Sequence, residues 1–123
     1  MSDRGYTLIE VPVERRLWPE HDLIVGVMEH VRRNLLSLAP EIPAECEIDL
    51  LAAGTAHNIE PRPILGIYSP PTVLEGLPNC DVLNQIVSDW CDRRSDEELR
   101  TIGRATDAPT WTALQAAGIH PQR

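Results

Sequence analysis

A run of apolar residues at helical spacing in "DLIVGVMEHVRRNLLSL", residues 22–38, is the feature that most constrains how this chain folds. A leucine or valine recurs at every third or fourth position, which places these side chains along one face of a helix. The members of this stripe are Leu23, Val27, Val31, Leu35 and Leu38. A helix with one apolar face must bury it against another element, so the rest of the chain has to supply that surface.

The sequence also predicts the two ends and the polar side of this helix. Asp22 is the expected N-cap, because its carboxylate can accept a hydrogen bond from one of the first backbone N–H groups. Pro40 is expected to mark the end of the helix. Glu29, Arg32 and Arg33 fall outside the apolar stripe and are expected on the polar side.

Three segments have the residue pattern of β-strands and can form the surface that the helix needs. In "YTLIEVPVERRLW", residues 6–18, the side chains alternate, and Pro12 predicts a sheet edge because proline lacks an N–H donor. "ECEIDLLAAG", residues 45–54, alternates in the same way, and "PILGIYS", residues 63–69, is a third short strand. The inward side chains are expected to be Ile9, Val11, Val13, Cys46, Ile48 and Leu50, with Glu10, Glu47 and Asp49 outward.

The chain from residue 79 onward is predicted to be helical. A first helix, residues 81–94, carries an apolar face made of Val82, Leu83, Ile86, Val87 and Trp90. Ser95 and Glu98 form an S-x-x-E capping box that opens a second helix. Asp107 is the expected N-cap of a third helix, with Pro109 in its first turn and Gly118 at its end.

These elements predict an α+β fold with the order β-α-β-β-α-α-α. It consists of a small, mostly antiparallel three-stranded sheet with one packed helix, followed by a C-terminal three-helix segment. The length of 123 residues fits a single domain. Within it, residues 1–70 are expected to form the α+β part and residues 79–119 a helical subdomain.

The balance of charges bears on the partners of the chain. Its net charge is −8, and all 11 basic residues are arginine. Such a surface repels phosphate groups, which disfavours direct binding to nucleic acid or to an anionic membrane and favours a basic protein. We find no signal peptide and no stretch long enough to span a membrane. Together with an odd number of cysteines and no C-x-x-C motif, this favours a reducing, cytoplasmic location.

No motif for a metal, a cofactor or a phosphate group is found. The four histidines and three cysteines never stand at the spacing of zinc ligands, and the glycines form no phosphate-binding loop. We therefore expect no cofactor, no metal and no catalytic residue. Cys80 is the best candidate for a reactive thiol, because it follows Asn79 at a predicted helix start. Cys46 and Cys91 are expected to be packing residues.

Two neighbouring groups of polar residues are the candidates for binding a partner. Strand alternation turns the acidic side chains of 45–49 outward. The loop "AHNIEPRP" gathers polar side chains on a connection too long for a tight turn, and loops held by a scaffold often carry binding residues. The predicted partner-binding residues are Glu45, Glu47, Asp49, His57, Asn58, Glu60 and Arg62.

Three classes of function remain. The first is a non-enzymatic acidic protein that binds, and thereby inhibits or regulates, a basic protein, in the manner of an inhibitor, immunity or anti-defence protein. That partner could itself bind nucleic acid, and a homodimer is left open. The second is a helix-turn-helix transcription regulator using residues 81–119, which is weakened because its would-be recognition helix has no basic residue. The third is a small enzyme built on Cys80 or His57.

Overall fold

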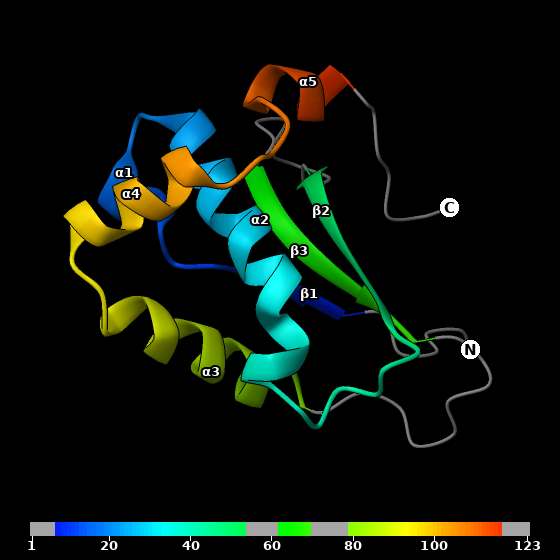
Figure 1. Cartoon of the computed structure of the whole chain (residues 1–123). Coiled ribbons are helices and arrows are strands. Elements are labelled where there is room, and N and C mark those ends of the chain that lie inside the picture. The colour runs from blue at the N-terminus through cyan, green and yellow to red at the C-terminus, as the bar shows by residue number, and fades with distance from the viewer. Residues whose placement is uncertain (1–6, 54–61, 70–78, 117–123) are drawn as a thin grey trace.

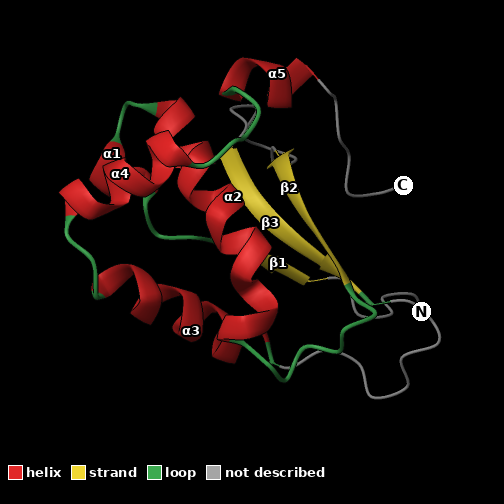
Figure 2. Ribbon diagram, viewed as in Figure 1, coloured by secondary structure: helices red, strands yellow, loops and turns green. Residues whose placement is uncertain are grey.

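Three antiparallel strands form a sheet, and helix α2 lies along it (Figures 1 and 2). The structure is a computed structural model that describes residues 7–53, 62–69 and 79–116. The elements, in chain order, are β1 (Thr7–Ile9), α1 (Glu14–Leu17), α2 (His21–Leu38), β2 (Glu47–Ala53), β3 (Arg62–Tyr68), α3 (Cys80–Asp92), α4 (Asp96–Ala105) and α5 (Trp111–Ala116).

The strand order is β1-β3-β2, so β3 is central and both of its neighbours pair with it in the antiparallel sense. This confirms the predicted α+β fold, and it places the segment before Pro12 at a sheet edge, as expected. The pairing puts Ile9 opposite Leu65, and Leu65 opposite Leu50. Directly paired residues share a face, so these three side chains lie together on the face that meets α2.

The segment after β1 differs from the prediction of one strand over residues 6–18. The ladder ends at Ile9, and Glu14–Leu17 form the one-turn helix α1, which was not predicted. Pro12 has no N–H to donate to a ladder, and the Val13 N–H turns back to donate to the Val11 carbonyl oxygen at 2.7 Å. Val11 and Val13 are nevertheless buried, so the alternation predicted their burial and not their conformation.

The core is aliphatic and is built around α2. The predicted stripe members Val27, Val31 and Leu35 are fully buried, and Leu23 and Leu38 pack at its margin. Figure 1 shows α1 and α4 on the side of α2 that faces away from the sheet, while α3 contacts both α2 and the edge strand β1. A second face of α2 is therefore buried as well, and it contributes Ile24, Val25 and Met28 to the core.

The contact between α2 and α4 depends on two glycines. A Cβ atom built on Gly26 would collide with the carbonyl group of Gly103, and one built on Gly103 would lie 2.7 Å from the carbonyl oxygen of Leu23. Both residues are buried. The two backbones can approach this closely only because neither residue has a side chain.

Glu29 was predicted to lie on the polar side of the helix, outside the apolar stripe, but it is buried. Its side chain is 7% exposed and is held by Arg32 Nη2 at 2.6 Å and Arg33 Nε at 2.7 Å. Arg32 also donates to the carbonyl oxygen of Ile48, and Arg33 to that of Asp107. The carboxylate is buried because α2 is covered on two sides, and the two arginines connect it to β2 and to the segment before α5.

Two predicted helix caps are also wrong. α2 begins at His21, so Asp22 lies inside the first turn, where its Oδ1 accepts the backbone N–H of Trp111 at 2.8 Å. Asp107 does not cap α5, which begins only at Trp111. There the Thr110 hydroxyl accepts the N–H of Ala113 at 3.1 Å. Pro109 precedes the helix, and Gly118 lies outside the described residues.

The capping box of α4 and most of the apolar face of α3 agree with the sequence predictions. The capping box of α4 is confirmed, because Ser95 and Glu98 make both reciprocal bonds, at 3.1 and 2.7 Å. The apolar face of α3 is confirmed except at one of its five predicted positions, and Ile86 packs against the core. Leu83, Val87 and Trp90 are buried, whereas Val82, predicted on this face, is 48% exposed.

We predict that Gly26→Ala destabilises the protein by about 1–3 kcal/mol, the range observed when a methyl group is forced into a tightly packed contact. Urea unfolding followed by circular dichroism measures this. Ser37→Ala, on the exposed side of the same helix, is the matched control and should change stability by less than about 0.5 kcal/mol. Equal stability of Gly26→Ala and the wild type would show that α2 and α4 do not touch as described.

A second prediction concerns Glu29 and pH. Its bonds to Arg32 lower its pKa, against the opposing effect of burial, and the bonds to Arg33 lower it further. The stabilisation is therefore complete above the unfolded-state pKa of about 4.3 and is lost as the pH falls through the lower folded pKa. Glu29→Gln should cost about 1–3 kcal/mol near neutral pH.

The loss caused by Glu29→Gln should shrink towards zero as the pH falls through the lowered folded-state pKa of Glu29 and the wild-type carboxyl itself becomes protonated. Urea unfolding of both proteins from neutral to acidic pH is the measurement. Glu41→Gln, at an exposed position, is the control and should follow the wild type throughout. A difference that stays constant with pH would contradict the assigned role of the ionised carboxylate.

Candidate functional site

The acidic strand residues lie on the side of the sheet that faces away from α2. Glu47 and Asp49 are exposed and alternate with the inward residues Ile48 and Leu50. Glu45 is exposed as well and stands two residues before β2. Cys46 is buried between these carboxylates, as predicted.

Two exposed apolar side chains share this face with the carboxylates. Tyr68 lies opposite Glu47, and both Leu8 and Asp49 lie opposite Gly66, which has no side chain to separate them. Tyr68 is 41% and Leu8 38% exposed. We call Leu8, Glu47, Asp49 and Tyr68 the outer sheet face. Exposed apolar groups beside charged ones are the composition of a protein-binding surface.

The structure does not bring all the predicted binding residues together. His57, Asn58 and Glu60 lie outside the described residues. Arg62 pairs with Ala53 at one end of the β2–β3 ladder, whereas Glu47 pairs with Tyr68 at the other end. At about 3.3 Å per residue, these two ends are roughly 20 Å apart.

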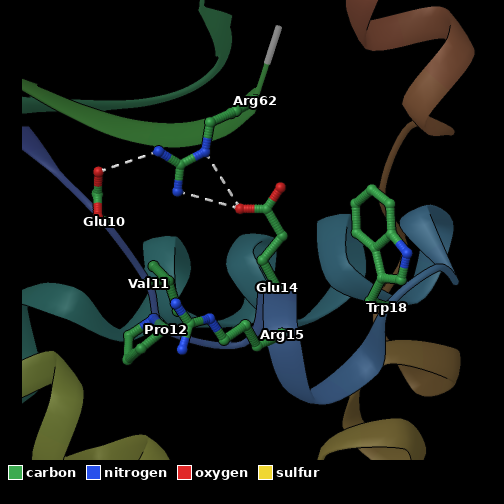
Figure 3. A pocket seen from close by; sticks show the side chains of 7 residues that line it. All are labelled: Glu10, Val11, Pro12, Glu14, Arg15, Trp18 and Arg62. Carbon is green, nitrogen blue, oxygen red and sulfur yellow. Dashed lines mark hydrogen bonds and ion pairs between the residues drawn. The ribbon is translucent and has the colours of Figure 1, made fainter. Parts of the chain in front are cut away.

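Arg62 instead belongs to a groove beside α1 (Figure 3). Its Nη2 lies 3.1 Å from Glu14 Oε1 and its Nη1 lies 3.4 Å from Glu10 Oε2. Burial disfavours the charge of the guanidinium, but the bonds to Glu14 and the charges of Glu14 and Glu10 outweigh this and raise its pKa. Arg62 thus crosslinks β3 to the segment that leads into α1.

The groove has a volume of about 600 Å³ and contains both apolar and charged groups. Its lining residues are Glu10, Val11, Pro12, Glu14, Arg15, Trp18 and Arg62. In Figure 3, Trp18 and Glu10 stand at opposite ends, with the Arg62–Glu14 pair between them. Trp18 is 59% exposed, which is unusual for so large an apolar side chain.

Trp18 is the first member of a row of three aromatic rings. Its ring centroid lies 4.9 Å from that of His21 in an edge-on arrangement, and His21 stacks on Trp111 at 5.9 Å with an interplanar angle of 11°. We call these residues the aromatic row. A second groove, of about 410 Å³, runs beside His21 and Trp111 and is also lined by Glu20 and Asp22.

The aromatic row was not predicted from the sequence. Trp18 belongs to no apolar stripe, and it is followed by Pro19 and Glu20, which was the available sign of an exposed position. The contact of His21 with Trp111 joins residues 90 positions apart, and no local pattern predicts it.

The three C-terminal helices do not pack on one another as a tri-helical DNA-binding unit does. α4 packs chiefly on α2, while α5 contacts α2 and β2. α5 has only six residues, its Leu114 is buried, and its Trp111 is stacked on His21. A recognition helix needs a free face that can enter the major groove. This arrangement gives the helix-turn-helix hypothesis no support.

The three cysteines differ in accessibility. Cys46 and Cys91 are buried, as predicted, and Cys80 is exposed at the first position of α3. The Cys80 thiol lies 3.7 Å from the carbonyl oxygen of Leu8 and 3.3 Å from Asn84 Nδ2. Neither neighbour can act as a general base, so these contacts add nothing in favour of a catalytic thiol.

The described residues contain no group of three or more side chains that could hold a metal ion. No helix among them is long and apolar enough to cross a membrane. Comparisons of this chain with protein-family models, curated proteins and solved structures gave no match.

We predict that thiol alkylation of the folded protein modifies Cys80 first and Cys91 last. Cys91 is fully buried, and burial raises its pKa to about 11, so its reactive thiolate is scarce near neutral pH. Timed labelling with iodoacetamide, followed by peptide mass mapping, measures the order. The same labelling in urea is the control, since unfolding should make all three rates similar. Faster labelling of Cys91 than of Cys80 in the folded protein would contradict the described packing of α3.

Proposed function

We propose that this protein is a non-enzymatic interaction protein that binds a basic protein partner through the outer sheet face and regulates or inhibits it. The observation that carries the proposal is the presence of Glu47 and Asp49 beside the exposed side chains of Leu8 and Tyr68. The apolar groups would supply the buried area of an interface, and the carboxylates would select a partner of opposite charge.

The distribution of ion pairs supports this choice of partner. Five arginines of the described chain are bound to carboxylates elsewhere in the molecule, and these are Arg16, Arg32, Arg33, Arg62 and Arg100. Arg32 lies near enough to Asp49 to feel its charge, but its guanidinium is bound to Glu29 and to the Ile48 carbonyl oxygen. Within the described residues, no arginine forms an ion pair with Glu45, Glu47 or Asp49.

A net charge of −8 extends the same argument to the whole chain. An acidic surface attracts basic proteins over distances of about 10 Å and accelerates their association. Proteins that bind nucleic acid carry the required basic surface, and covering that surface would inhibit them. Such a regulator would act in the cytoplasm, where its three cysteines would stay reduced.

The test is a comparative capture experiment with the protein immobilised and the proteins of its source cell as input. We expect a protein of high isoelectric point to be retained at about 50 mM salt and released at about 300 mM, because screening weakens charge attraction. Glu47→Gln/Asp49→Asn should weaken its binding by at least about tenfold, since two charges facing the partner are removed.

The matched control is Asp92→Asn/Glu97→Gln, which removes the same net charge at exposed positions of α3 and α4. It should leave binding within about twofold of the wild type, as expected for charges outside an interface. Equal weakening by both double variants would show that only net charge matters. A retained partner that is acidic, or that resists salt, would overturn the proposal.

A further inference from the structure

The aromatic row offers a second surface with a chemistry of its own. Trp18 leaves 59% of its surface exposed in the groove beside α1, and His21, whose ring contacts it, lines the second groove beside α5. Tryptophan is enriched at the energetic centres of interfaces, because it combines a large apolar area with an electron-rich ring. An indole held in the open at a groove is therefore suited to a ligand.

The ring of Trp18 is held in place before any ligand arrives. His21 contacts its edge, Trp111 stacks on His21, and Asp22 accepts the backbone N–H of Trp111. The three rings thus belong to three separate elements, since Trp18 follows α1, His21 begins α2 and Trp111 begins α5. A side chain that is already ordered loses little conformational entropy on binding, so more of the contact energy appears as affinity.

Another tryptophan of this chain already has a guanidinium over its ring. Arg94 places its guanidinium carbon 4.1 Å from the centroid of Trp90, and its Nη1 donates to the Trp90 carbonyl oxygen at 2.7 Å. A cation over the face of an indole is attracted by the charge distribution of the ring. No arginine from the described part of the chain stands over Trp18 in this way.

The charges around Trp18 favour a cation. Glu10 and Glu14 share Arg62 in the first groove, while Glu20 and Asp22 line the second groove with only the longer Arg100–Glu20 pair of 3.5 Å. Four carboxylates line the two grooves, against the lining arginines Arg15 and Arg62 and the arginine paired with Glu20, which is Arg100. Arg15 is the one of these three that makes no ion pair within the described residues.

The first groove meets the outer side of the sheet at Arg62, and Leu51, which lies between Arg62 and Asp49 on that side, is 3% exposed. Arg62, Gly66 and Tyr68 alternate with the inward residues Pro63, Leu65 and Ile67, so Arg62 lies at one end of that face and Tyr68 at the other. A span of roughly 20 Å fits within one interface of standard size, about 800 Å² on each partner. Trp18 stands beyond Arg62, at the end of the groove opposite Glu10, so a partner that contacts both surfaces has to span more than this distance.

We infer that Trp18, supported by His21 and Trp111, receives an arginine side chain of the basic partner, with the carboxylates of the two neighbouring grooves supplying the opposite charge. This inference rests on the proposed function for the identity of the partner as a basic protein. The local chemistry at Trp18 is independent of it and is tested separately.

The experiment is an NMR titration of the indole N–H signals of the 15N-labelled protein with the peptide acetyl-Gly-Arg-Gly-amide. Single Trp→Phe variants assign the three signals. We expect the Trp18 signal to shift in a saturable way at millimolar peptide, as befits one cation–π contact with nearby carboxylates. Trp90, which is 5% exposed and covered by Arg94, is the internal control and should not shift.

The sign of the ligand charge is tested with matched peptides and one variant. The lysine peptide should bind more weakly than the arginine peptide, and the glutamine and glutamate peptides should give no saturable shift. Arg15→Ala should tighten binding of the arginine peptide about two- to fivefold, since a like charge is removed from the groove. Binding of the glutamate peptide, or weaker arginine binding by Arg15→Ala, would overturn the inference.

The two proposals fail separately. Glu47→Gln/Asp49→Asn should leave the peptide titration unchanged, because these residues lie outside both grooves. The Trp111 signal, two rings along the aromatic row, should shift together with that of Trp18 in the wild type, and Trp18→Ala should abolish this shift and weaken capture of the basic partner at least fivefold. Unchanged capture by Trp18→Ala would overturn the inference about Trp18, while the proposal that the outer sheet face binds the partner would still stand. Trp18→Phe, which keeps an aromatic face, should restore part of the affinity.

Discussion

The fold depends on the burial of α2 on more than one side. Six consecutive residues, 24–29, are all buried, and six consecutive positions of a helix point in every direction around its axis. One face of α2 therefore meets the sheet and another meets α4, where Gly26 and Gly103 bring the two backbones into contact. The same double burial encloses Glu29, whose charge is then retained only because Arg32 and Arg33 bind it.

The placement of the functional surfaces follows from this packing. With α2 on the inner face of the sheet, the alternation of β2 turns Glu47 and Asp49 to the opposite face. With α1 required to bring the chain from β1 back to α2, Trp18 is left at the junction between α1 and α2. Asp22, displaced from the capping role, is free to hold Trp111 and so to complete the aromatic row.

Periodicity predicted most of the secondary structure because it is a local property of the chain. The apolar stripe of α2, the alternation in β2 and the Ser95–Glu98 capping box each involve residues that are close together in the sequence, and each is confirmed. The wrong predictions for Glu29 and Asp22 have a non-local cause. Glu29 is buried by α2's second set of neighbours, and Asp22 is engaged by a residue 89 positions away. The exposed row of Trp18, His21 and Trp111 likewise exists only once α5 reaches α2.

In the proposed complex, this acidic chain recognises a basic protein with two surfaces, the outer sheet face and the groove at Trp18. Hydrogen-exchange mass spectrometry of the purified protein, with and without the captured partner, tests it most directly. With the partner bound, we expect slower backbone amide exchange in Glu47–Ala53 and in residues 14–23, and unchanged exchange in α3 and on the exposed side of α4. Protection confined to α3 and α4, with these two segments unaffected, would contradict it.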